Sequence, residues 1–275
     1  MSRWSDLVGA MSAVAKRPSR RTGPARAGAF MPRVTLWVDG ERVRESGVAS
    51  NVNTEALTTP GDTAAALKAI EALAPKPARP GLHGLRVVVG APFVRYYALP
   101  WRPHPKPEQW VSMARMQAAQ AGAGAGAEPW RYAVTDGAWQ QGRLAAAMPE
   151  ALCAGIERLC KTRRLQLLGI EPGFTFAMQK HARHIRDGNI AVVELEQAAS
   201  GAAIAHIGLR RGGGWSGFIA LPVAGPLDDV LRDAFVLAAT EPPERCYAIG
   251  PGAADRWVAD ATLVEWLAAP WEASP

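Results

Sequence analysis

Alternating and continuous apolar runs divide the chain from residue 33 onward into short strands and helices. Residues 34–38 and 41–45 flank Asp39-Gly40, a pair typical of a β-hairpin turn. Residues 63–74 then carry apolar side chains at helical spacing behind Asp62, a favourable N-cap residue. This pattern predicts a hairpin followed by an amphipathic helix.

The stretch from Leu85 to Trp101 reads L-R-V-V-V-G-A-P-F-V-R-Y-Y-A-L-P-W. Residues 85–89 form a β-branched apolar run, which predicts a buried strand. Residues 93–99 alternate between two faces, which predicts a half-buried strand, and residues 90–92 supply the turn. We expect the two strands to pair as the central strands of a first lobe.

The middle of the chain continues this mixed pattern. It first predicts a helix over 106–121, a glycine-rich connector over 122–126 and a hairpin with strands over 130–135 and 139–145. A helix that starts at Pro149, a strand over 165–170 and a helix from residue 174 are expected next. The connector follows a helix rather than a strand, so it lacks the setting of a nucleotide loop. Cys153 and Cys160 share the apolar stripe of their helix and are expected in the core.

The second half begins with three strand-like runs. They cover 190–195, 202–209 and 215–221, and they predict an antiparallel meander. The meander is followed by a periodic helix over 228–239 and a short strand over 246–249. After the turn Gly250-Pro251-Gly252, the pattern predicts a helix start at 253–259 and an edge segment over 263–266. Trp271 is expected in a terminal tail.

These elements predict an α/β protein with two lobes of mixed sheets flanked by helices. The expected divisions are a disordered basic tail over 1–32, a first lobe over 33–188, a reduced second lobe over 189–268 and a tail over 269–275. Within the first tail, residues 5–16 can form an amphipathic helix whose apolar side includes Trp4, Leu7 and Met11. We favour a frayed tail, or an upstream extension if translation starts at Met31; the alternative is a helix that docks on a partner or membrane surface.

Composition adds constraints on location and partners. The first 30 residues carry six of the 31 basic residues and one of the 25 acidic residues, so 25 basic and 24 acidic groups remain in a nearly neutral body. A nucleic-acid groove in the body is therefore not indicated. No apolar window reaches the roughly 18–20 residues of a spanning helix, no secretory signal opens the chain, and its three cysteines lack C-x-x-C spacing. We expect a cytoplasmic protein.

The sequence holds no complete catalytic constellation. A Ser-His-Asp hydrolase has no support, because no G-x-S-x-G occurs and the histidines lie in loop or basic segments. His181 and His184 are interleaved with Lys180, Arg183 and Arg186, which favours a solvated basic face over a metal site. We predict no catalytic residue and no metal site.

The element order resembles the ribonuclease H-like, or actin-like ATPase, fold. The resemblance depends on the meander over 190–221 followed by Y-A-I-G-P-G-A-A, on the stretch from Leu85 to Trp101, and on the helix that carries Trp110. These segments are similar to two degenerate members of that superfamily: the cytoplasmic actin-like protein of type IV pilus assembly and the cytoplasmic domain of the type II secretion L component. The resemblance spans residues 33–268.

The sequence departs from the active members at the nucleotide turns. The family uses Asp-x-Gly turns whose amides approach phosphate, with a carboxylate that organises magnesium, but this chain reads V-E-L-E-Q over 193–197 at the second turn. The resemblance implies Glu194, Gly250 and Gly252 as the residues nearest a nucleotide. We expect no ATP turnover and no bound cofactor.

The resemblance implies a non-catalytic cytoplasmic scaffold or adaptor at the inner membrane. Its partner would be the cytoplasmic tail of an inner-membrane assembly protein of a type IV pilus or type II secretion system, with contacts through Arg95 and the tail residues Trp4, Leu7 and Met11. Two alternatives stay open. One is a weak nucleotide-binding, ATPase-like switch that uses Glu194, Glu196 and the 250–252 turn; the other is a DNA-repair or SOS accessory protein that acts through the basic N-terminal tail.

Overall fold

The computed structural model describes residues 32–46, 53–77, 83–103, 106–122, 129–198, 200–258 and 264–271. The predicted N-terminal amphipathic helix, with Trp4, Leu7 and Met11, and the 123–126 part of the glycine-rich connector lie outside the described residues. None of the described helices is both long enough and apolar enough to span a membrane.

The first sheet is built around the strand that opens the described chain. Its strands, in spatial order, are β3 (Thr54–Ala56), β2 (Arg42–Ser46), β1 (Arg33–Val38), β4 (Gly84–Val89) and β8 (Gln166–Pro172). The β1–β2–β3 part is antiparallel, whereas β4 and β8 run parallel to β1. The predicted hairpin around Asp39-Gly40 is confirmed.

The second sheet repeats this topology. Its order is β11 (Gly214–Pro222), β10 (Ala203–Arg211), β9 (Ile190–Gln197), β12 (Arg245–Gly250) and β13 (Val264–Ala268). An antiparallel meander again precedes two parallel strands. The predicted meander and edge strand are confirmed, and residues 254–256 form a single 3₁₀ turn where a helix start was expected.

A third sheet is inserted between β4 and α4. It contains β5 (Arg95–Leu99), β7 (Arg143–Pro149) and β6 (Trp130–Val134) in antiparallel order and carries α3 (Pro107–Gln120). The expectation that β4 and β5 pair was therefore wrong. Because β1 and β8 occupy both edges of β4, no edge of that strand is left for β5.

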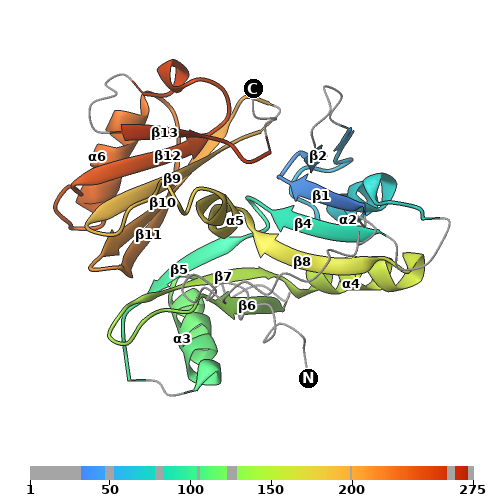
Figure 1. Ribbon diagram of the computed structural model, residues 1–275, viewed down its shortest axis with the longest axis horizontal. Coiled ribbons are helices and arrows are strands. Elements are labelled where there is room, and N and C mark those ends of the chain that lie inside the picture. The colour runs from blue at the N-terminus through green and yellow to red at the C-terminus, as the bar shows by residue number, and fades with distance from the viewer. Residues whose placement is uncertain are drawn as a thin grey trace, which may run out of the picture.

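The remaining helices cover the two large sheets. They are α2 (Thr63–Leu73), α4 (Glu150–Arg163), α5 (Gly173–Lys180) and α6 (Leu227–Leu237). Asp62 caps α2 as predicted, because its carboxylate accepts a hydrogen bond from the Ala65 amide at 2.7 Å. The helix α5 lies between the sheets and contacts β4, β8 and β9 (Figure 1).

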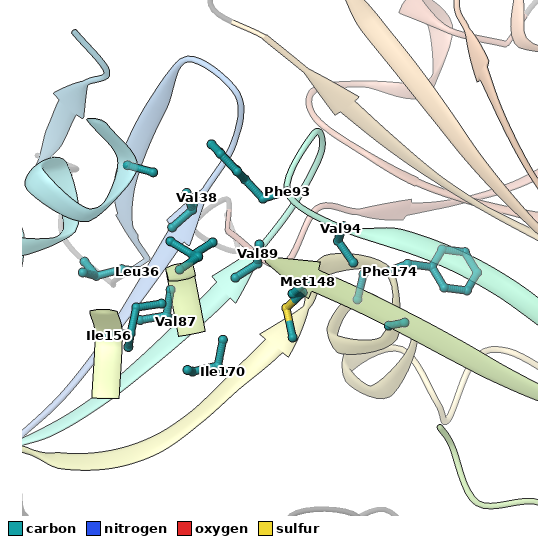
Figure 2. Close-up of a cluster of buried hydrophobic side chains, with 14 of the residues drawn as sticks. Leu36, Val38, Val87, Val89, Phe93, Val94, Met148, Ile156, Ile170 and Phe174 are labelled. Atoms are coloured by element: carbon teal, nitrogen blue, oxygen red, sulfur yellow. The ribbon is translucent and has the colours of Figure 1, made fainter. Parts of the chain in front are cut away.

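Two apolar cores form on either side of the second sheet. The larger core lies on the first sheet and includes Val87, Val89 and Ile156 (Figure 2). It also takes in Ile190 and Val192 of β9, while Ala191, Val193 and Leu195 face the smaller core under α6. Even-numbered residues of β9 therefore face the first lobe.

The end of the described chain packs back on the first sheet. Trp271 was expected in a tail, but it is buried and its ring lies 4.0 Å from that of Trp37, centroid to centroid. Phe176 and Ala269 complete this small cluster, and the Arg44 guanidinium lies over Trp271 at 5.5 Å. This contact could not be predicted from the sequence, because no periodic pattern surrounds Trp271.

Replacing Trp271 by alanine should lower the free energy of unfolding by about 3 kcal/mol, because it leaves a cavity against Trp37. The matched control is Trp139→Ala, since Trp139 is 71% exposed, and its cost should stay below about 1 kcal/mol. Urea denaturation followed by circular dichroism measures both. Similar small losses in the two variants would contradict the packing described for Trp271.

Candidate functional site

The two lobes meet where equivalent turns of the repeated topology face one another. One turn joins β1 to β2 and the other joins β9 to β10. The Ser200 amide donates to Glu41 Oε2 at 2.8 Å and so connects the two turns directly. The candidate site is the region between these turns and the end of β4.

Asp39 organises the first turn. Its buried carboxylate accepts hydrogen bonds from the Glu41 and Arg42 amides, each at 2.9 Å, and it pairs with Arg44 at 3.2 Å. A Cβ on Gly40 would lie 2.9 Å from the Pro92 ring, so glycine allows the turn to approach the segment after β4. The Asp-Gly pair is thus explained by local structure.

Glu194 and Glu196 bring two buried carboxyl groups to the first-lobe face of β9. They are 0% and 7% exposed. Their spacing of two residues places both side chains on one face of the strand, and the even positions of β9 are those that face the first lobe. The apolar neighbours Val193 and Leu195 point to the opposite core.

Glu196 reaches across to the end of β4. The Ala91 amide donates to Glu196 Oε2 at 2.7 Å. A Cβ on Gly90 would lie 2.5 Å from the same oxygen, so the carboxyl group occupies the space that a side chain would need. Glycine at position 90 therefore permits this contact between the lobes.

His206 completes the cluster from the neighbouring strand. It lies directly opposite Glu194 in the β9–β10 register and is 3% exposed. Its Nδ1 lies 3.4 Å from Glu194 Oε2 and 3.6 Å from Glu196 Oε1. Among the described residues, these three side chains form one set whose potential metal-ligand atoms all lie within 4.8 Å of one another.

Tyr96 of β5 closes the site from the inserted sheet. Its hydroxyl accepts a hydrogen bond from the Phe174 amide at 2.9 Å, in the first turn of α5. Its ring lies 5.6 Å from that of His206 and 4.7 Å from that of Phe218, centroid to centroid. Burial, with the nearby Glu194 and Glu196, raises the pKa of the Tyr96 phenol well above its usual range, so it stays protonated.

Burial also controls the charge of the cluster. It raises the pKa of both Glu194 and Glu196 to about 8, and for Glu196 the neighbouring Glu194 raises it further while His206 opposes the shift. Burial lowers the pKa of His206, against an opposing effect of Glu196. In the absence of a cation, the three groups are therefore mainly neutral at pH 7.

A surface hollow leads toward this cluster. It has a volume of about 530 Å³ and is lined by residues of β5, β10 and β11 and the end of α3, among them Arg95, Tyr96, His206 and Phe218. His206 is the member of the cluster that faces the hollow. Neither Glu194 nor Glu196 lines the hollow.

The residues predicted from the sequence fall in different places. Glu194 belongs to the cluster. At the end of β12, a Cβ on Gly250 would meet Trp266 at 2.8 Å, and the Gly252 carbonyl accepts from the Trp266 indole at 3.2 Å, so this turn packs on tryptophan. Arg95 is exposed on β5, where its guanidinium lies 4.7 Å from the centre of the Trp130 ring.

Sequence reasoning missed His206, Tyr96 and the Gly90-Ala91 contact. The statement that the histidines lie in loop or basic segments was wrong for His206, which is buried in the middle of β10. The predicted meander contained a usable signal, since a short turn between β9 and β10 brings Glu194 and His206 opposite one another. Tyr96 and Ala91 come from distant segments and gave no such signal.

Comparison with known proteins identifies the fold. No family model and no curated protein matches the sequence. A solved chain of the PilM–PilN type IV pilus biogenesis complex is 14% identical, with 88% of this chain and 89% of that chain covered and a TM-score of 0.54. A *Bacteroides thetaiotaomicron* protein with an actin-like ATPase fold and unknown function is 12% identical, with 82% and 84% covered and a TM-score of 0.51.

The cytoplasmic domain of EpsL, an inner-membrane component of the *Vibrio cholerae* type II secretion system, is 10% identical, with 86% and 89% covered and a TM-score of 0.45. The first two similarities, together with the repeated sheet order, show that this chain has the two-lobed actin-like fold. The resemblance inferred from the sequence is confirmed at the level of the fold.

The free energy of unfolding, measured in EDTA, should fall by about 2 kcal/mol per pH unit between pH 7 and 8. In this range folded Glu194 and Glu196 (pKa about 8) hold protons that the unfolded chain (pKa 4.5) has lost, so rising pH favours unfolding. Folded His206 has a lowered pKa, so near pH 6.5 the unfolded chain binds more protons there and His206 opposes this trend, but above pH 7 its contribution is small.

The double variant Glu194→Gln, Glu196→Gln should lose most of this pH dependence, because the amides keep the shape of the carboxyl groups but do not titrate. Chemical denaturation at several pH values compares the two proteins. An equal slope in the variant, or stability that rises with pH in the native chain, would contradict the assignment.

Proposed function

We propose that this chain is a protein-binding adaptor that does not turn over ATP. It would bind the cytoplasmic tail of an inner-membrane assembly protein, of the kind found in type IV pilus or type II secretion systems, and thereby act at the cytoplasmic face of that membrane. The observation that carries this proposal is that the chain's own carboxyl groups engage the backbone amides between the two lobes.

The fit of a nucleotide to this region is poor. In an active member of the fold, the turn amides are free to approach phosphate. Here four such amides already donate to carboxylates of the chain: Glu41 and Arg42 to Asp39, Ala91 to Glu196, and Ser200 to Glu41. A phosphate group would have to displace these contacts and would meet carboxyl oxygens in their place.

The charge state of the cluster also argues against ATP turnover. Phosphoryl transfer needs an ionised carboxylate to organise magnesium. Glu194, which the resemblance implies as one of the residues nearest a nucleotide, is buried and mainly protonated at pH 7. The Gly250–Gly252 turn packs on Trp266 and supplies no acid or base.

The comparison with the PilM–PilN complex supports the binding role. That solved chain has the same fold over nearly its full length and comes from a complex of type IV pilus biogenesis. A two-lobed fold whose cleft is closed by its own side chains can still present its outer surfaces to a partner. An adaptor therefore needs none of the chemistry that this site lacks.

The surface of β5 is the candidate contact for the partner. Arg95 is exposed there, held over Trp130, and with Tyr97 it borders the 530 Å³ hollow between the inserted sheet and the second lobe. A cation held by an aromatic ring next to a hollow can recognise an acidic or carbonyl-rich peptide segment.

Peptides of the cytoplasmic tails of inner-membrane proteins encoded beside this chain test the proposal by fluorescence anisotropy. At least one tail should bind saturably, with the same Kd within about twofold in the presence and absence of Mg-ATP. Arg95→Glu should weaken binding at least about tenfold, the effect of losing one central interface contact.

Arg232→Glu is the matched control, because Arg232 is exposed on α6 and pairs only locally with Asp229 at 2.8 Å. It should leave the affinity unchanged. Binding to none of the tails, or binding that requires Mg-ATP, would overturn the proposed function; equal losses in the two arginine variants would remove Arg95 from the contact.

A further inference from the structure

We propose that Glu194, Glu196 and His206 form a buried binding site for a divalent transition-metal ion such as Zn²⁺. The three residues offer two carboxylate oxygens and one imidazole nitrogen from adjacent strands, all within 4.8 Å of one another. The site lies inside this chain and needs no nucleotide. It is independent of the proposed adaptor function.

The oxygen atoms of the cluster lack partners. Glu194 Oε1 and Glu196 Oε1 are both buried and accept no hydrogen bond from the described residues. Such atoms are rare in folded proteins, because a buried polar group without a partner costs free energy. A cation beside His206 would satisfy Glu196 Oε1, and it would satisfy Glu194 Oε1 when that carboxylate binds through both oxygens.

The distances fit a metal better than a hydrogen bond. His206 Nδ1 lies 3.4 Å from Glu194 Oε2 and 3.6 Å from Glu196 Oε1. Strong bonds between nitrogen and carboxylate are shorter, about 2.7–2.9 Å. Two ligands of a tetrahedral Zn²⁺, each about 2.0–2.1 Å from the ion, lie about 3.3 Å apart.

The second carboxylate is already oriented for this role. Ala91 donates to Glu196 Oε2 at 2.7 Å, which fixes that oxygen and leaves Oε1 toward His206. Such outer contacts hold metal ligands in position. Two carboxylates also neutralise the charge of a divalent ion, so the loaded site carries no net charge in its buried setting.

The donor set selects the class of ion. Imidazole favours Zn²⁺ and its transition-metal neighbours over Mg²⁺, which prefers oxygen and retains water. His206 and Tyr96 line the hollow, so an ion would enter the cluster from that side. A bound ion would hold β9 and β10 together and, through Glu196 and Ala91, fix the second lobe against the first.

The test uses the full chain without an affinity tag, stripped with EDTA and dialysed. Zn²⁺ is titrated in competition with a chromophoric chelator, and bound metal is counted by mass spectrometry. We expect one Zn²⁺ per chain and a rise in the thermal unfolding midpoint. Co²⁺ bound in its place should show the visible absorption of a four-coordinate site.

Glu196→Gln and His206→Gln should each weaken Zn²⁺ binding at least about tenfold. The control is the double variant His181→Gln, His184→Gln, whose rings lie 6.2 Å apart near the surface and outside the cluster. It should bind like the native chain. If His206→Gln does not fold, Glu196→Gln decides, because its amide oxygen can still accept from Ala91.

Three results would overturn the proposal. The first is that Zn²⁺ does not bind saturably at one ion per chain. The second is that folded Glu196→Gln binds Zn²⁺ with the affinity of the native chain, and the third is that the His181→Gln, His184→Gln control loses Zn²⁺ binding. The last result would show that the ion binds the surface histidines.

Discussion

The hydrogen bond from the Ala91 amide to Glu196 determines how the two lobes meet. It places a buried carboxyl group of the second lobe at the end of β4 in the first lobe, where Gly90 leaves room for it. Because Glu194 and His206 pack beside it, the region between the lobes contains buried titratable groups. Our proposals that ATP is not turned over here and that a metal ion binds both depend on this arrangement.

The repeated topology explains why these groups meet. Each large sheet begins with a meander and continues with two parallel strands, so the turns after β1 and β9 occupy equivalent places and face one another. In this chain the first turn is closed by Asp39 and its arginines, and the second lobe contributes glutamates. The actin-like fold is therefore kept while the contacts between its lobes are made by the chain itself.

Much of the fold could be predicted from the sequence, because hairpin turns, capping residues and periodicity are local signals. The hairpin at Asp39-Gly40 and the cap of α2 are examples. The sequence does not predict that β4 and β5 lie in different sheets, or that Trp271 is buried. Both features depend on which strand edges and which faces of the sheet other segments already occupy. The sequence pointed to Glu194 but not to its partner His206. Residues of a strand that is buried on both faces, such as β10, do not reveal from the sequence which neighbours each face meets.

Amide hydrogen exchange at Ala91 and Ser200 shows whether carboxyl groups of this chain hold the amides between its lobes. We expect both amides to be protected in the free protein, and saturating Mg-ATP to leave their exchange rates unchanged. Rapid exchange of these amides without nucleotide, or protection that appears only when Mg-ATP is added, would contradict this expectation.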